Sequence, residues 1–114
     1  MAKRPDPPAL PPHWFQILLA LCDRDLHGLA IMQEVLARTG GRMRLWPAML
    51  YRNLARLAEA ELVIEIDAPS DAELRGGRPR FYRITPPGRR ACAAEAQQLE
   101  GYVTAARQKK LLKA

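Results

Sequence analysis

The stretch that decides the fold is "LWPAMLYRNLARLAEAELV", residues 45–63. Leu50, Leu54 and Leu57 recur at intervals of four and three residues, which is the spacing of one face of an α-helix. Pro47 suits the first turn of such a helix, because the N–H that proline lacks has no helical partner there. The stretch therefore predicts a helix that buries its leucines and leaves a second, polar face whose purpose is to be explained.

Two shorter amphipathic helices are expected before this one. Residues 13–22 place apolar side chains at helical spacing from Trp14, and residues 28–39 gather theirs on one side. Gly40 and Gly41 then supply the permissive backbone that ends helices. The sequence "RMRL", residues 42–45, alternates polar and apolar side chains and suits a short strand that needs a partner.

The second half of the chain predicts a β-hairpin and a long helix. "LVIEID" (residues 62–67) and "RFYRIT" (residues 80–85) are rich in β-branched and aromatic residues, and a segment with Pro, Ser, Asp and paired Gly joins them. After Pro86 and Pro87, strong helix formers follow almost to the end of the sequence. They predict a last helix of about 24 residues.

This order of elements is that of a winged helix-turn-helix domain with a C-terminal helical extension, a mainly α fold with a small β-hairpin. Residues 1–12 contain five prolines and are expected to form an extended or disordered arm. Residues 13–87 are expected to form the winged helix domain, and residues 88–114 a dimerisation helix.

Charge favours a polyanionic partner. The formal net charge is +6, and 14 of the 18 basic residues are arginine, whose planar guanidinium suits phosphates and guanine edges. A genome that prefers arginine codons, together with solubility, explains the same excess.

The polar face of the predicted third helix has the chemistry of base recognition. Met49, Arg52, Asn53 and Arg56 follow helical spacing and are expected to share one exposed stripe. Arginine donates a fork of hydrogen bonds to guanine, and asparagine pairs with adenine in the major groove. An ordinary solvated helix face has the same composition, so the helix alone does not decide the function.

The loop of the predicted hairpin adds a second basic element. Gly76 and Gly77 are surrounded by four arginines, Arg75, Arg78, Arg80 and Arg83. No acidic residue lies between Glu73 and the end of the hairpin. A basic tip reaches backbone phosphates or a minor groove, although charge also protects an exposed hairpin edge from aggregation. Helix and tip together favour double-stranded DNA over single-stranded RNA, which calls for more exposed aromatic residues.

The last helix is expected to hold a homodimer. One of its faces carries a heptad seam spaced 4, 3, 4 and 3, formed by Cys92, Ala96, Leu99, Val103 and Ala106. A helix about 36 Å long is too long to be covered by the short first helix. We expect the seam to pack on a second copy of itself and on Trp14 and Leu18 of the other chain.

Other classes of function find little support in the sequence. Cys22 and Cys92 are the only cysteines, and neither a CxxC motif nor a cluster of ligands accompanies them, so neither a metal site nor a disulfide framework is expected. Cys92 is read as a packing residue, with cross-linking of two chains or oxidant sensing as the alternative. His27 has no nucleophile or acid at catalytic spacing and is expected to cap a helix. We therefore expect neither an enzyme nor a cofactor.

No apolar run approaches the length of a membrane span, and the N-terminal residues lack the apolar core of a signal peptide. A cytoplasmic protein that does not contact a membrane is expected.

Four motifs, in order and with their gaps, carry a family resemblance. They are "HG" at His27-Gly28, "RTGGRMRL" at residues 38–45, "P-x-x-LY-x-x-L-x-RL" at residues 47–57 and "R-x-R-FYRIT-P-x-G" at residues 78–88. From about Ile17 to Leu112 the chain resembles the PadR-like transcriptional regulators, in the short type with one C-terminal helix. The resemblance implies a homodimeric repressor that holds an inverted-repeat operator with its third helix and wing, with Tyr51 near the DNA backbone. Some members of the family bind flat aromatic compounds between subunits, so a small aromatic effector is a possible partner and Trp14 a candidate pocket residue; packing of Trp14 in the core or the dimer interface is the favoured alternative.

The chain departs from the family pattern at Trp46, Ala48, Met49 and Glu61. The family commonly has Ser or Gly at the first position, a Gly-Thr or Gly-Ser pair at the next two, and glycine at the last. These departures leave open a second function, in which the winged fold binds a small molecule or a protein and no longer binds DNA.

Overall fold

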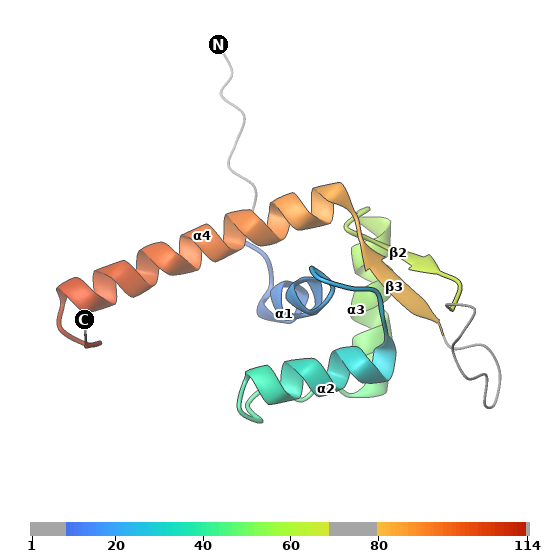
Figure 1. Cartoon of the computed structure of the whole chain (residues 1–114), viewed down its shortest axis with the longest axis horizontal. Coiled ribbons are helices and arrows are strands. Elements are labelled where there is room, and N and C mark those ends of the chain that lie inside the picture. The colour runs from blue at the N-terminus through green and yellow to red at the C-terminus, as the bar shows by residue number, and fades with distance from the viewer. Residues whose placement is uncertain (1–8, 69–79, 114) are drawn as a thin grey trace, which may run out of the picture.

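The computed structural model describes residues 9–68 and 80–113. Its elements are, in order, α1 (Pro12–Ala20), β1 (Leu26–His27), α2 (Gly28–Arg38), α3 (Pro47–Glu59), β2 (Val63–Ile66), β3 (Phe81–Ile84) and α4 (Pro86–Gln108). Figure 1 shows α1, α2 and α3 grouped together, the sheet beside α3, and α4 crossing the group and continuing past it. The predicted fold class, a winged helix with a long C-terminal helix, is confirmed.

Helix boundaries agree closely with the sequence prediction. α3 begins at Pro47, and α4 spans 23 residues. α1 begins at Pro12 instead of residue 13, and α4 begins at Pro86, so the expected domain boundary at residue 88 falls inside its first turn. Most of the proline-rich arm, residues 1–8, lies outside the described residues. None of the helices in the described ranges is long and apolar enough to span a membrane.

The sheet differs from the prediction in one strand. It has three antiparallel strands in the order β1-β3-β2, with Leu26 opposite Tyr82 and Val63 opposite Ile84. Residues 42–45 ("RMRL") are not a strand; the third strand comes from the two residues just before α2. Four alternating residues do not specify a partner, whereas Leu26 reaches the edge of β3 and buries its side chain there.

One hydrophobic core joins the first three helices to the sheet. α1 packs against α2 and α3, and α3 packs against β2. The leucine face predicted for residues 45–63 is confirmed, because Leu50, Leu54 and Leu57 are at most 1% exposed. Their neighbours in the core include Ile17, Leu18, Ile31, Val35 and Val63.

Local hydrogen bonds explain where α2 begins and where α3 ends. The Ala30 N–H donates to Nδ1 of His27 at 3.2 Å, so the capping role predicted for His27 is confirmed. After α3, the Leu62 N–H donates to the Leu57 carbonyl at 2.9 Å, and Glu61 takes a left-handed conformation with φ of 63°. Glycine adopts that conformation without strain, which gives a physical reason for the family glycine at this position.

Two further family motifs depend on close packing at glycine. A Cβ atom at Gly28 would collide with the phenol oxygen of Tyr51, so the "HG" and "LY" motifs form one contact. A Cβ at Gly88 would collide with the Leu62 carbonyl, which fixes the start of α4 against the end of α3. Thr85 caps α4 there, because its Oγ1 accepts a hydrogen bond from the Gly88 N–H at 3.0 Å.

Candidate nucleic-acid interface

The outward face of α3 carries the two arginines predicted to read bases. Arg52 and Arg56 are exposed, whereas Met49 and Asn53 of the predicted stripe are half-buried. The exposed residues of α3 are Pro47, Ala48, Tyr51, Arg52, Ala55, Arg56, Ala58 and Glu59. The stripe is therefore displaced toward Tyr51, because the other side of the helix rests on α1.

Asn53 connects α3 to α1. The indole Nε1–H of Trp14 donates to Oδ1 of Asn53 at 3.1 Å, and Nδ2 of Asn53 donates to the Met49 carbonyl at 2.8 Å. The prediction that Asn53 faces outward with the arginines is wrong, because its amide is used at this contact. The same bond places the half-buried Trp14 against its own chain. No local sequence pattern indicates this pair, because its members lie 39 residues apart.

Tyr51 lies beside the two arginines and is 45% exposed. Its phenol oxygen lies against Gly28, at the first residue of α2. The side chain is thus held by packing at one end while part of it faces solvent.

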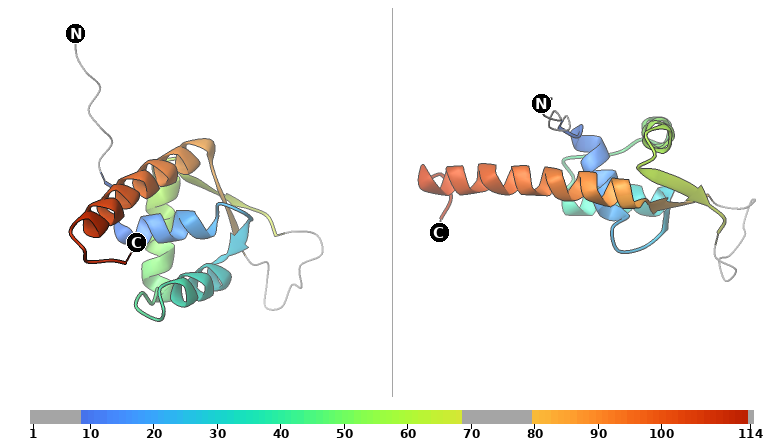
Figure 2. Two further views of the ribbon diagram at one scale, coloured as in Figure 1. Left: turned by 60° about the vertical axis from the view of Figure 1, so that its left-hand side comes forward. Right: turned by 90° about the horizontal axis from the view of Figure 1, so that it is seen from above.

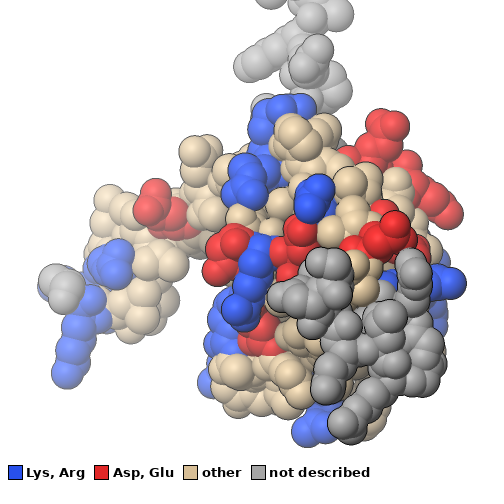
Figure 3. Space-filling model, turned by 45° about the vertical axis from the view of Figure 1, so that its right-hand side comes forward, with Lys and Arg blue, Asp and Glu red and all other residues tan. Residues whose placement is uncertain are grey.

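The arginines of the wing strand are paired with acidic residues. Arg83 binds Asp25 through two hydrogen bonds, from Nε at 3.1 Å and from Nη2 at 2.8 Å, and these raise the pKa of Arg83. Arg80 Nε lies 3.3 Å from Glu65 Oε1. Figure 3 accordingly shows basic and acidic side chains interspersed on this side of the molecule. The strand is therefore less basic than its sequence suggests, because the acidic partners come from other elements.

Arg75 and Arg78, the two arginines predicted nearest the tip of the wing, lie outside the described residues.

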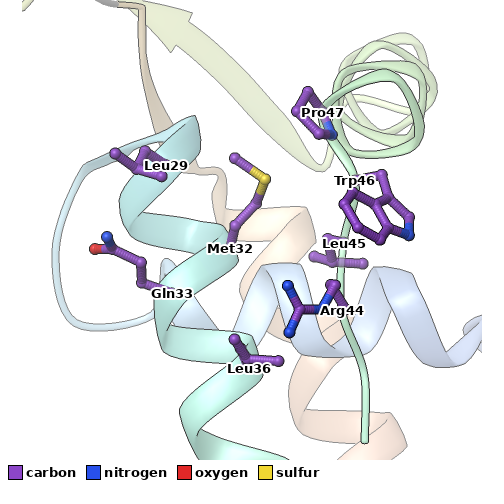
Figure 4. A pocket seen from close by; sticks show the side chains of 8 residues that line it. All are labelled: Leu29, Met32, Gln33, Leu36, Arg44, Leu45, Trp46 and Pro47. Atoms are coloured by element: carbon purple, nitrogen blue, oxygen red, sulfur yellow. The ribbon is translucent and has the colours of Figure 1, made fainter. Parts of the chain in front are cut away.

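A cavity of about 250 Å³ opens beside the start of α3 (Figure 4). It is lined by Leu29, Met32, Gln33 and Leu36 of α2 and by Arg44, Leu45, Trp46 and Pro47. The Arg44 guanidinium lies 5.5 Å from the centre of the Trp46 ring, a cation–π contact at the rim. Trp14, the predicted pocket residue, is not among these lining residues. Trp46 was identified from the sequence only as a departure from the family pattern.

The predicted seam on α4 divides into a covered part and an exposed part. Cys92 is 3% exposed and Leu18 is fully buried, both in the core of their own chain. The prediction that these two contact a second chain is therefore wrong. Ala96, Leu99 and Val103 of the seam are exposed, and Ala106 is half-buried. Tyr102, which is not part of the predicted seam, is 59% exposed. Figure 2 shows this half of α4 extending away from the other elements.

Within residues 9–68 and 80–113, no group of three or more His, Cys, Asp or Glu side chains has the arrangement of a metal site.

The three-helix core, the antiparallel wing and the exposed basic face of α3 define a winged helix protein. The chain belongs to the transcriptional regulator PadR-like family, whose sequence profile matches residues 17–94. A comparison with functionally curated proteins found no match.

Solved structures share this fold. A PadR family transcription regulator from Clostridium difficile R20291 superposes with a TM-score of 0.70 at 20% identity, covering 84% of this chain and 95% of the other. A transcriptional regulator from Clostridium thermocellum gives 0.67 at 23% identity, covering 89% and 90%. Bacillus subtilis PadR, solved in complex with operator DNA, gives 0.60 at 17% identity, covering 71% of this chain and 44% of that one.

Proposed function

We propose that this protein is a homodimeric transcriptional repressor that binds an inverted-repeat operator in double-stranded DNA. The observation that carries the proposal is the position of Arg52 and Arg56. Both are exposed on a helix whose opposite face is completely buried, so the helix is rigidly held and its guanidinium groups project outward. In the described part of the chain, neither has an acidic partner within 4.0 Å.

The roles follow from these positions. Arg52 and Arg56 donate to base edges in the major groove, and Tyr51 donates to a phosphate. Arg75, Arg78 and Arg80 of the wing contact the backbone, Arg80 after exchanging Glu65 for a phosphate. Asn53 supports the helix from inside through Trp14. The Bacillus subtilis PadR, which shares this fold and was solved in complex with operator DNA, supports a DNA-binding function.

The dimer forms through the exposed half of α4. Leu99 and Val103 are 39% and 38% exposed. Burial of their apolar side chains lowers the free energy, because it removes apolar surface from water. A second copy of the same helix covers them in a two-fold arrangement. Two copies of α3 then reach half-sites about one DNA turn, or roughly 34 Å, apart.

The decisive experiment is selection of bound duplexes from a random pool at physiological salt. Enrichment of an inverted repeat supports DNA recognition and two-fold symmetry together. Affinity for the selected duplex should fall by several powers of ten between about 50 and 200 mM salt, if roughly 6–10 phosphates are contacted. A pool that stays random, or a flat salt response, contradicts the proposal.

Substitution locates the surface. Arg52→Ala and Arg56→Ala should each weaken operator binding about 5- to 100-fold, because each loses a contact to a base edge. Arg90→Ala, which removes an exposed arginine from α4, is the matched control and should have a much smaller effect. Equal losses in all three variants indicate a general effect of charge and not a reading surface.

A second function is favoured by the cavity beside Trp46. In this alternative the winged fold binds a small molecule or a protein segment and does not bind DNA. The selection then enriches no sequence, and Arg52→Ala and Arg56→Ala leave the partner's affinity unchanged.

A further inference from the structure

The cavity between α2 and the residues just before α3 combines a buried apolar floor with an exposed rim. Leu45 at the floor is 3% exposed, and Met32 and Leu36 beside it are half-buried. Leu29 and Trp46 at the rim are exposed, although both side chains are large and apolar. Exposed apolar side chains around a recess are typical of a binding site. The cavity therefore offers apolar surface for a ligand to cover.

Arg44 gives this rim a positive charge. Its side chain is exposed, and Figure 4 shows it extending from the segment before α3 toward α2. No acidic side chain is among the described residues that line the cavity. Within residues 9–68 and 80–113, Arg44 also has no acidic partner at 4.0 Å or less. Because a guanidinium donates two parallel hydrogen bonds to a carboxylate, the charge favours an anionic ligand.

Trp46 gives the site an aromatic wall. The Arg44 guanidinium carbon lies 5.5 Å from the centre of the indole ring, yet the Trp46 side chain remains 61% exposed. Much of the indole is therefore open to a second partner, and aromatic rings pack well on one another. The cavity volume of about 250 Å³ is below the roughly 300–1,000 Å³ of pockets for drug-sized ligands. It suits a molecule with one or two rings.

We propose that this cavity binds a small planar aromatic carboxylate of one or two rings. The carboxylate accepts hydrogen bonds from Arg44, and the ring lies between Trp46 and the apolar floor. The described lining residues come from α2 and residues 44–47, and none of them belongs to α1 or α4, so one chain forms the site by itself. Trp46 occupies a position where the family commonly has Ser or Gly. The aromatic wall is therefore a feature of this chain.

The test is a titration of the full chain, labelled with ¹⁵N, with sodium 2-naphthoate while NMR spectroscopy follows the indole N–H groups. The chain has two tryptophans, and Trp14→Phe assigns their two signals. The Trp46 signal should shift to saturation with a dissociation constant of about 10 µM to 1 mM, the range for a ligand of this size. The Trp14 signal should stay fixed, because its N–H is bonded to Asn53 outside the cavity.

Two further probes test the chemistry of recognition. 2-Naphthalenemethanol keeps the rings and lacks the negative charge, so it should bind at least about 10-fold more weakly than 2-naphthoate. Inorganic phosphate has the charge and no ring, so it should not shift the Trp46 signal at the same concentration. An equal response to phosphate would indicate a general anion site and overturn the proposal. The proposal rests on the cavity and not on DNA binding, so every measurement is made without DNA.

Three variants assign the contacts, with affinity measured by calorimetry. Arg44→Ala should weaken 2-naphthoate binding about 10- to 100-fold, because it removes a charge-assisted hydrogen bond. Arg42→Ala removes an exposed arginine that does not line the cavity, and as the matched control it should have little effect. Trp46→Ser, which restores a residue common in the family, should also weaken binding. Arg44 and Trp46 are exposed, so circular dichroism should show an unchanged fold in these variants.

Three results would overturn the proposal. They are a Trp46 signal that does not shift, a shift of the Trp14 signal alone, and full affinity in Arg44→Ala.

Discussion

The apolar faces of the two longest helices, α3 and α4, are buried to different extents within the chain. α3 has 13 residues, and its three inward leucines are buried by α1, α2 and β2. α4 has 23 residues, yet its buried residues are only Gly88 and Cys92, both near its start. Beyond them, Leu99, Tyr102 and Val103 remain open to solvent.

This difference separates two kinds of surface. A helix whose apolar face is complete within one chain is fixed in position, and its polar face is available for a ligand. When part of a helix's apolar face is exposed, a second surface that covers it lowers the free energy. We therefore expect substitutions in α3 to act on folding or on DNA, and substitutions in the second half of α4 to act on assembly.

The largest effect on folding is expected from Leu54→Ala. Leu54 is 1% exposed at the centre of the core, so its truncation removes buried surface and leaves a cavity. The free energy of unfolding should fall by about 2–5 kcal/mol. Urea denaturation measures the change, with Leu29→Ala, at a side chain 54% exposed, as the control. A similar loss at both positions contradicts the view that α3 completes its core within one chain.

Assembly is tested by the double variant Leu99→Asp, Val103→Asp. Each charge appears twice in a two-fold interface, so the dimer dissociation constant should rise at least about 100-fold, which corresponds to roughly 3 kcal/mol. Sedimentation equilibrium measures it. Gln97→Asp, on the opposite face of α4, is the matched control. Circular dichroism should show an unchanged fold, and a double variant that remains dimeric would move the interface elsewhere.

A smaller effect is expected from Asn53→Ala. It removes the hydrogen bond to Trp14, and the free energy of unfolding should fall by about 1 kcal/mol. Trp14→Phe removes the same bond, so the two substitutions together should cost less than the sum of their separate effects. Arg52→Ala should leave the free energy of unfolding nearly unchanged. Strict additivity of Asn53→Ala and Trp14→Phe would show that the bond contributes nothing to stability.

Local patterns in the sequence predicted most of the elements. The leucine spacing of residues 45–63 predicted α3 because helix periodicity depends on neighbours three and four residues apart. Pro47 and Gly40-Gly41 marked boundaries for the same reason, since caps act within one turn. β1 was missed, because a two-residue strand has no pattern of its own and forms only where β3 offers an edge.

The candidate site was predicted only in part. Arg52 and Arg56 were correctly placed at the surface, but Asn53 was not, because its exposure depends on where Trp14 comes to lie. The wing arginines were read as a basic cluster because the acid that binds Arg83, Asp25, is distant in the sequence.

The sequence by itself determined the helices, the hairpin, the basic character and the family of this protein, since each depends on residue type and short-range spacing. Only the tertiary structure decided which polar residues of α3 face outward, which arginines are paired and which part of α4 is uncovered. The physical reason is common to all three. Each depends on the approach of side chains from different elements, and that approach is set by how the core packs and not by any pattern along the chain.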